Sequence, residues 1–91
     1  MNRIGPVIPA QFEQIKIAIL RSKVEAWNGP DVLENVCGLL GLGSVRNTNY
    51  VLEASFAGLE GHMRVDLASW KELAPHIKLL LVTKPYSYDD Y

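Results

Sequence analysis

The sequence predicts a small α+β domain, because some segments repeat apolar residues with the period of a strand and others with that of a helix. Residues 50–57 and 62–68 carry apolar side chains at every second position. Residues 10–27 and 30–40 carry them at helical spacing. A chain of 91 residues with 48% hydrophobic content can bury one modest core. We therefore expect residues 1–91 to form a single domain.

The N-terminal part is predicted to be an extended arm followed by a long helix. Pro6 and Pro9 fix their own backbone and favour extended backbone before them, which gives an arm over residues 1–9. The helix expected over residues 10–27 has two apolar stripes, more than a surface helix needs. One stripe is Phe12, Ile15, Ile19 and Ala26, and the other is Ile17, Leu20, Val24 and Trp27, with Lys16 and Lys23 between them.

A second helix is predicted over residues 30–40, and it completes a helical hairpin with the first. The segment Asn28-Gly29-Pro30-Asp31 supplies a cap, a proline at the first helical position and an acidic residue in the first turn. Gly41 is expected to end the helix in the left-handed conformation, with Leu42 in a Schellman-type contact. Cys37 falls on the apolar face, where a buried thiol is expected.

The two alternating segments predict an antiparallel β-hairpin with a tight turn at 58–61. The register that places apolar residues together pairs Phe56 with Met63, Ala54 with Val65 and Leu52 with Leu67. A slip of one residue would set the apolar residues of one strand against the polar residues of the other.

The C-terminal part is predicted to be a helix that starts with a capping box at Ser69 and Glu72 and is kinked at Pro75. The apolar run over residues 77–83 leaves a third strand as the alternative, because periodicity does not separate the two in a short apolar run. Residues 85–91 form an acidic aromatic tail that we expect to be flexible.

Composition excludes several classes of protein. The net charge is −1, and the basic residues are scattered from Arg3 to Lys84, which disfavours binding to a nucleic-acid backbone or an anionic membrane. A lone cysteine cannot form an internal disulfide, and neither a signal peptide nor a long apolar span is present. These features indicate a cytoplasmic protein.

No motif in the sequence indicates a cofactor or a metal. The glycines of residues 38–44 follow a predicted helix, whereas a phosphate loop needs them before one. His62, His76 and Cys37 lack the short spacings of a zinc site. We therefore expect neither a cofactor nor a metal ion.

Two groups of polar residues are candidates for contact with a partner. The first lies on the polar face of the predicted hairpin, where mixed charge is typical of a solvated or docking surface, although carboxylates beside a histidine also occur in enzymes. The second is the tail, which combines aromatic area with negative charge. The first group is Glu53, His62, Arg64 and Asp66, and the second is Tyr86, Tyr88, Asp89, Asp90 and Tyr91.

The favoured hypothesis is a non-enzymatic protein-binding module, an adaptor or an inhibitor of a larger protein assembly. Small proteins of this kind are often carried by mobile genetic elements. The alternatives are nucleic-acid binding through Arg46, Arg64, Lys71 and Lys78, and a small enzyme that uses Glu53, His62 and Asp66. A homodimer, formed through helix 10–27 or through the edge of the hairpin, would cover the surplus apolar surface.

Overall fold

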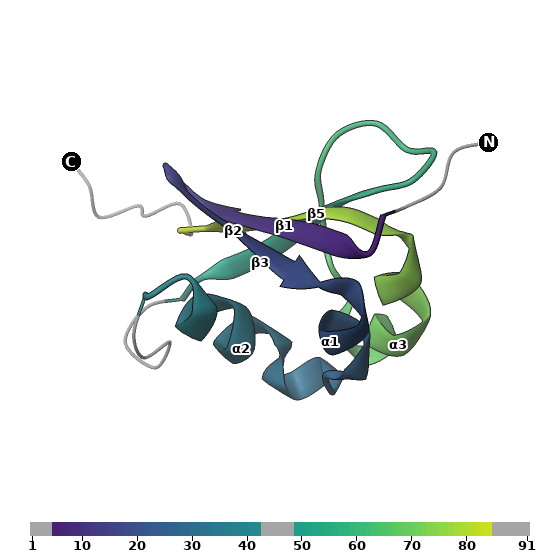
Figure 1. The fold of residues 1–91 in the computed structure, drawn as a ribbon, viewed down its shortest axis with the longest axis horizontal. Coiled ribbons are helices and arrows are strands. Elements are labelled where there is room, and N and C mark those ends of the chain that lie inside the picture. The colour runs from purple at the N-terminus through teal and green to yellow at the C-terminus, as the bar shows by residue number, and fades with distance from the viewer. Residues whose placement is uncertain (1–4, 43–48, 85–91) are drawn as a thin grey trace.

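The computed structural model of this chain describes residues 5–42 and 49–84. Within them, a five-stranded mixed sheet lies over three short helices, as Figure 1 shows. The predicted α+β class is confirmed. The strands are β1 (Val7–Phe12), β2 (Ile15–Leu20), β3 (Val51–Phe56), β4 (Met63–Arg64) and β5 (Ile77–Thr83), and the helices are α1 (Arg21–Ala26), α2 (Val32–Leu39) and α3 (Trp70–Leu73).

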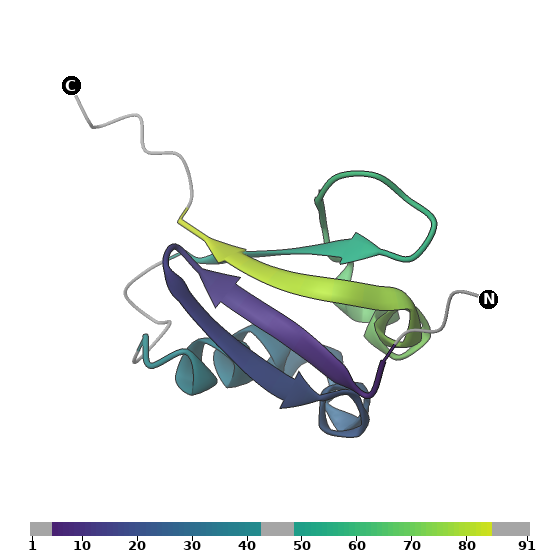
Figure 2. The same ribbon diagram turned by 45° about the horizontal axis from the view of Figure 1, so that its top comes forward.

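The strand order in the sheet is β2-β1-β5-β3-β4. The central strands β1 and β5 come from opposite ends of the chain and run parallel, whereas every other neighbouring pair is antiparallel. All three helices lie on one side of the sheet in Figure 1. Figure 2 shows the opposite side, and none of the described segments crosses it. The described chain therefore forms two layers, with one face of the sheet uncovered.

The prediction of a helix over residues 10–27 is wrong. Strand β1 begins at Val7, within the extended arm predicted over residues 1–9, of which residues 1–4 lie outside the described residues. Residues 7–20 form the β1–β2 hairpin, and only the six residues of α1 are helical. The error has a physical cause, since Ile15, Ile17 and Ile19 satisfy both periods. Isoleucine is branched at Cβ, which favours strand over helix. The predicted helical hairpin and the predicted dimer through helix 10–27 both required this long helix, so both are wrong as well.

The residues between β1 and β2 explain why the sequence shows no turn motif for this hairpin. Glu13 and Gln14 form the turn between Phe12 and Ile15, which are opposite each other in the register. Glu13 has a φ of 53°, in the left-handed region where glycine or asparagine is more usual. The Gln11 side chain donates a hydrogen bond to the Glu13 carbonyl at 2.9 Å, which helps hold this turn.

The second helix is found where it was predicted. A single 3-10 turn at Gly29–Asp31 leads into α2. Gly41 has a φ of 79°, and the Leu42 N–H donates to the Cys37 carbonyl at 2.9 Å. The Gly41 N–H donates to the Gly38 carbonyl at 3.1 Å. These two bonds are the pair that defines a Schellman motif, so the predicted helix end is confirmed.

The predicted β3–β4 hairpin is confirmed in β3 but is wrong in its register and in the length of its second strand. Ala54 lies opposite Met63 and not Val65, a shift of two residues that leaves each side chain on its predicted face. The strand expected over residues 62–68 is reduced to the two residues of β4. Gly58 and Gly61 both have left-handed φ values, 83° and 80°, which make the connection wider than the tight turn expected.

The C-terminal segment follows the alternative prediction, a strand over residues 77–83. Helix α3 has four residues and continues into a 3-10 turn with Pro75 near its start, after which β5 begins. Ser69 is the N-cap residue of α3 as predicted, but the capping box is wrong, because the Ser69 side chain makes no cap hydrogen bond and its hydroxyl donates to the Asp66 carboxylate at 2.9 Å. A central position between two strands favours extended backbone for the apolar run of β5.

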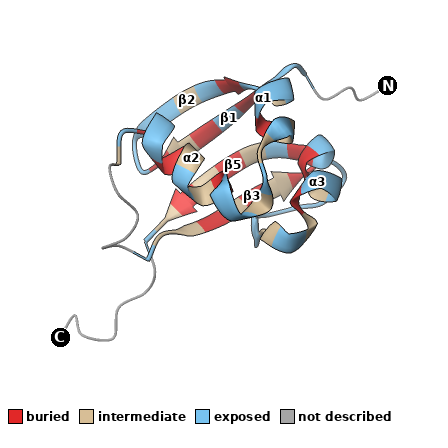
Figure 3. Cartoon of the chain, turned by 90° about the horizontal axis from the view of Figure 1, so that it is seen from below, coloured by how far each residue is buried: buried red, intermediate tan, exposed pale blue. Residues whose placement is uncertain are grey.

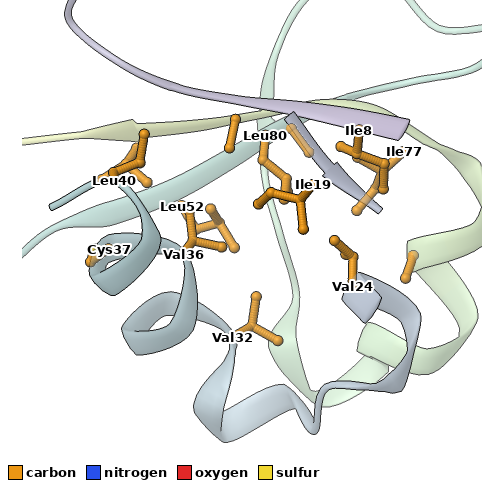
Figure 4. Packing of buried hydrophobic residues seen from close by; sticks show 14 of the residues in the cluster. Ile8, Ile19, Val24, Val32, Val36, Cys37, Leu40, Leu52, Ile77 and Leu80 are labelled. Carbon is orange, nitrogen blue, oxygen red and sulfur yellow. The ribbon is translucent and has the colours of Figure 1, made fainter. Parts of the chain in front are cut away.

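The core lies between the sheet and the helices, as the burial colours of Figure 3 and the close-up of Figure 4 show. Cys37 is buried there, as predicted. The indole N–H of the buried Trp70 donates to the Val24 carbonyl at 3.1 Å, so α3 satisfies a group at the end of α1. The largest fully buried side chains are Trp70, Ile8, Ile77, Leu80, Val24, Val32, Val36, Val82 and Cys37.

Candidate functional site

The face of the sheet that the helices leave uncovered is the candidate site, and we call it the open face. Side chains alternate between the two faces of a strand, so the residues between the buried positions of each strand point there. The open face consists of Val7, Pro9 and Gln11 of β1, Lys16, Ala18 and Leu20 of β2, Leu79, Leu81 and Thr83 of β5, Val51, Glu53 and Ser55 of β3, and Arg64 of β4.

Apolar side chains occupy the middle of the open face and one end of it. Leu79 and Leu81 lie half-buried on the central strand β5, although no described element covers that side. Val7 and Leu20 are opposite each other on β1 and β2 and are 42% and 59% exposed. Scattered exposed apolar residues are ordinary, whereas a contiguous group of them is typical of an interaction surface.

Charged residues lie on both edge strands of the open face, and one more, Glu53, lies on β3 directly opposite Leu81. Glu53 and Arg64 are opposite each other on β3 and β4, with Glu53 half-buried and Arg64 exposed. Lys16 lies on β2 at the other edge of the sheet. Leu79 and Leu81 therefore have charged residues of both signs around them.

Only two members of the first predicted group face each other across paired strands, namely Glu53 and Arg64. His62 lies exposed in the loop before β4. The Asp66 carboxylate serves its own turn, because it accepts hydrogen bonds from the Ala68 N–H at 3.2 Å and from the Ser69 hydroxyl at 2.9 Å. The four residues therefore do not form one catalytic cluster.

The tail group, Tyr86, Tyr88, Asp89, Asp90 and Tyr91, lies outside the described residues, and so does Arg46. Of the other basic residues predicted to contact nucleic acid, Lys71 donates hydrogen bonds to the carbonyls of Glu25 and Ala26 at 3.2 and 3.0 Å. These carbonyls end α1, so Lys71 acts as a cap within the fold. Lys78 is exposed at an irregularity in β5.

No group of three His, Cys, Asp or Glu side chains within residues 5–42 and 49–84 could hold a metal ion. No helix in these two segments has the length and apolar character needed to cross a bilayer.

Burial raises the pKa of the Cys37 thiol. We expect a water-soluble disulfide reagent to leave Cys37 unmodified in the native protein at pH 8 and to modify it fully in guanidinium. Because the native pKa lies above the unfolded pKa, this group stabilises the fold below the ordinary thiol range, and that contribution is lost as the pH rises through the raised value. Rapid stoichiometric labelling of the native protein would show that the thiol is accessible.

The apolar part of the open face could not be identified while residues 10–27 were interpreted as a helix. The alternation of Lys16, Ala18 and Leu20 with three isoleucines was the available signal. The sequence of β5 was a second signal, because it has leucines on both faces of the strand. A strand with one face in the core and the other in solvent has polar residues on the solvent face.

Comparison with known proteins gives no family assignment, since no family model, no curated protein and no solved structure matches this chain significantly.

Proposed function

We propose that this chain is a non-enzymatic protein-binding module, an adaptor or an inhibitor of a larger protein assembly, that binds an amphipathic helix of its partner on the open face. The observation that carries the proposal is the apolar centre of that face, formed by Leu79 and Leu81 on the central strand. Glu53 lies directly opposite Leu81, with Arg64 beyond it on the edge strand β4, and these two charged residues would select the partner by charge.

The pattern of β5 supports an apolar partner. A strand buried on one face alternates apolar and polar residues, whereas a strand buried on both faces is apolar almost throughout. In β5, Ile77, Leu80 and Val82 are buried under the helices, yet Leu79 and Leu81 on the other side are leucines too. The sequence of the central strand therefore suits a sheet covered on both sides, and the described helices cover one.

The distribution of charge supports a helix as the occupant. An amphipathic helix presents a narrow apolar stripe bordered by polar residues, and such helices bind apolar surfaces through anchors at helical spacing. The open face offers a matching apolar centre between Lys16 on the edge strand β2 and the Glu53–Arg64 pair on β3 and β4. Helices already pack on the opposite face of the same sheet, so the dimensions of such packing suit these strands.

The test is the substitution Leu81→Glu. A carboxylate in the centre of the docking surface would be desolvated without a partner, so we expect affinity for the protein captured by the unmodified chain to fall about 100-fold or more. The measurement is a titration of that purified partner by calorimetry, with Leu39→Glu as the matched control. Leu39 is an exposed leucine of α2, 41% exposed on the helical side.

A second variant separates loss of binding from loss of folding. Val7→Glu changes an open-face residue that is 42% exposed, so its carboxylate stays hydrated in the free protein. We expect this variant to melt like the unmodified chain and still to bind more weakly. Unchanged affinity in both open-face variants, or equal weakening by Leu39→Glu, would refute the proposed site.

A further inference from the structure

We propose that β2 pairs with β2 of a second copy of this chain, antiparallel and about a twofold axis at Ala18, so that the two sheets join into one. This inference uses the edge of the sheet and leaves the open face free for the partner proposed above. It rests on the backbone of one strand and does not depend on the proposed function.

The two edges of the sheet are unequal. β4 forms one edge and is only two residues long, which is a common way to prevent further pairing. β2 forms the other edge, and its six residues pair with β1 in an unbroken register. It contains neither a proline nor a bulge, and Lys16 is its single charged residue. Strand β2 therefore lacks most of the features that protect an edge.

The hydrogen-bonding groups on the free side of β2 follow from the pairing on its other side. The Arg21 N–H donates to the Pro6 carbonyl at 2.7 Å, next to the opposed pair Val7 and Leu20. Antiparallel ladders alternate between bonded and non-bonded pairs. Ile19, Ile17 and Ile15 therefore bond to β1. The backbone groups of Lys16, Ala18 and Leu20 point away from β1.

Self-pairing about Ala18 uses the outward backbone groups of Ala18 and Lys16 and the N–H of Leu20. The Leu20 carbonyl is not needed for this pairing to form, since Leu20 is the N-cap of α1 and its carbonyl accepts the first bond of that helix. Ala18 then faces Ala18 of the second copy, and Lys16 faces Leu20. Moving the axis to Ile17 would set Leu20 against Gln14 of the turn, and moving it to Lys16 would set like charges directly opposite each other. The register at Ala18 is therefore the one that the edge itself favours.

The side chains near this edge are also those that gain from being covered. Ile15 and Leu20 are the two ends of β2, and their side chains are 43% and 59% exposed. On the helical side, the register places Ile17 against Ile19 of the second copy, which extends the buried row of the sheet across the axis. A closed twofold pair uses β2, the one long edge strand of the described sheet, in each copy, so the association stops at two chains.

The test combines Ala18→Pro with two variants that introduce a charge at the same position. Because the Ala18 N–H points away from β1, proline removes only the hydrogen bond to the second copy and suits the extended backbone. By sedimentation at 1–200 µM, we expect the unmodified chain to have the mass of two chains and Ala18→Pro that of one. Equal circular dichroism spectra of both proteins will show that the variant is folded.

The two charged variants at position 18 test the register of the pairing. Ala18→Lys and Ala18→Glu each place like charges on the axis, so each alone is expected to dissociate at least about five-fold more readily. An equimolar mixture of the two is expected to recover the dimer, and Ala57→Lys, an exposed alanine outside β2, is the matched control. A monomeric unmodified chain, or a dimer lost in Leu81→Glu and retained in Ala18→Pro, would overturn the proposal.

Discussion

Replacement of Gly29 by alanine is expected to destabilise the fold by about 3 kcal/mol or more, a large part of the total stability of a small domain. A Cβ on Gly29 would lie 2.0 Å from the carbonyl oxygen of Leu67 and 3.0 Å from its carbonyl carbon. Both atoms belong to the backbone, so neither can turn aside as a side chain would. The turn before α2 and the turn before α3 would have to separate.

Gly38→Ala is the matched control for this prediction. Gly38 lies within α2, and a Cβ there would meet nothing within 4 Å. Alanine has a higher helix propensity than glycine, so we expect the free energy of unfolding of this variant to be higher by about 0.5–1 kcal/mol. Thermal unfolding of both variants gives the comparison. A Gly29→Ala protein with the same Tm as the unmodified chain would show that the two turns are not in close contact.

Arg21→Ala is expected to cost about 2–3 kcal/mol, because hydrogen bonds from a charged donor to partly buried carbonyls are among the stronger ones. The Arg21 guanidinium donates to the carbonyl of Gly5 at 2.8 Å, of Ala74 at 3.3 Å and of Ile77 at 2.8 Å. These groups belong to the chain before β1 and to the turn that leads into β5. One side chain thus joins both ends of the described fold where α1 begins.

Arg21→Lys separates the geometry of the guanidinium from its charge. A lysine ammonium is a compact donor and cannot reach three carbonyls in a fixed planar arrangement. We expect this variant to recover less than half of the stability lost in Arg21→Ala. Lys23→Ala, at an exposed position in the same helix, is the control and should change stability by less than about 0.5 kcal/mol. Full recovery in Arg21→Lys would reduce the role of Arg21 to its charge.

The sequence predicted those parts of the fold in which a local signal and the tertiary contacts agree. In α2, a proline at the start and Gly41 at the end act within one turn of the chain, and the structure has both. In β3, alternation alone was enough, because one face is buried and the other is not.

The sequence failed where pairing partners are distant in the chain or where the turn residue is unusual. β1 and β5 are stabilised by each other as parallel neighbours, and no local pattern reveals a contact over that separation. Glu13 has a left-handed φ in the turn between β1 and β2, but glutamate is not a residue type that predicts a turn. The shift of two residues between β3 and β4 kept the faces, so Glu53 and Arg64 were correctly placed on one surface. The apolar centre beside them was missed because residues 10–27 were expected to be a helix and a strand over residues 77–83 was only the alternative prediction.

Photo-crosslinking in the cells that express this chain measures whether a partner protein covers the open face. A benzoylphenylalanine is placed at position 81 on the open face and, in a matched protein, at position 39 on the helical side. We expect one dominant crosslinked protein from position 81 and none from position 39. Crosslinks from position 81 that remain within this chain, or a crosslinked partner common to both positions, would contradict it.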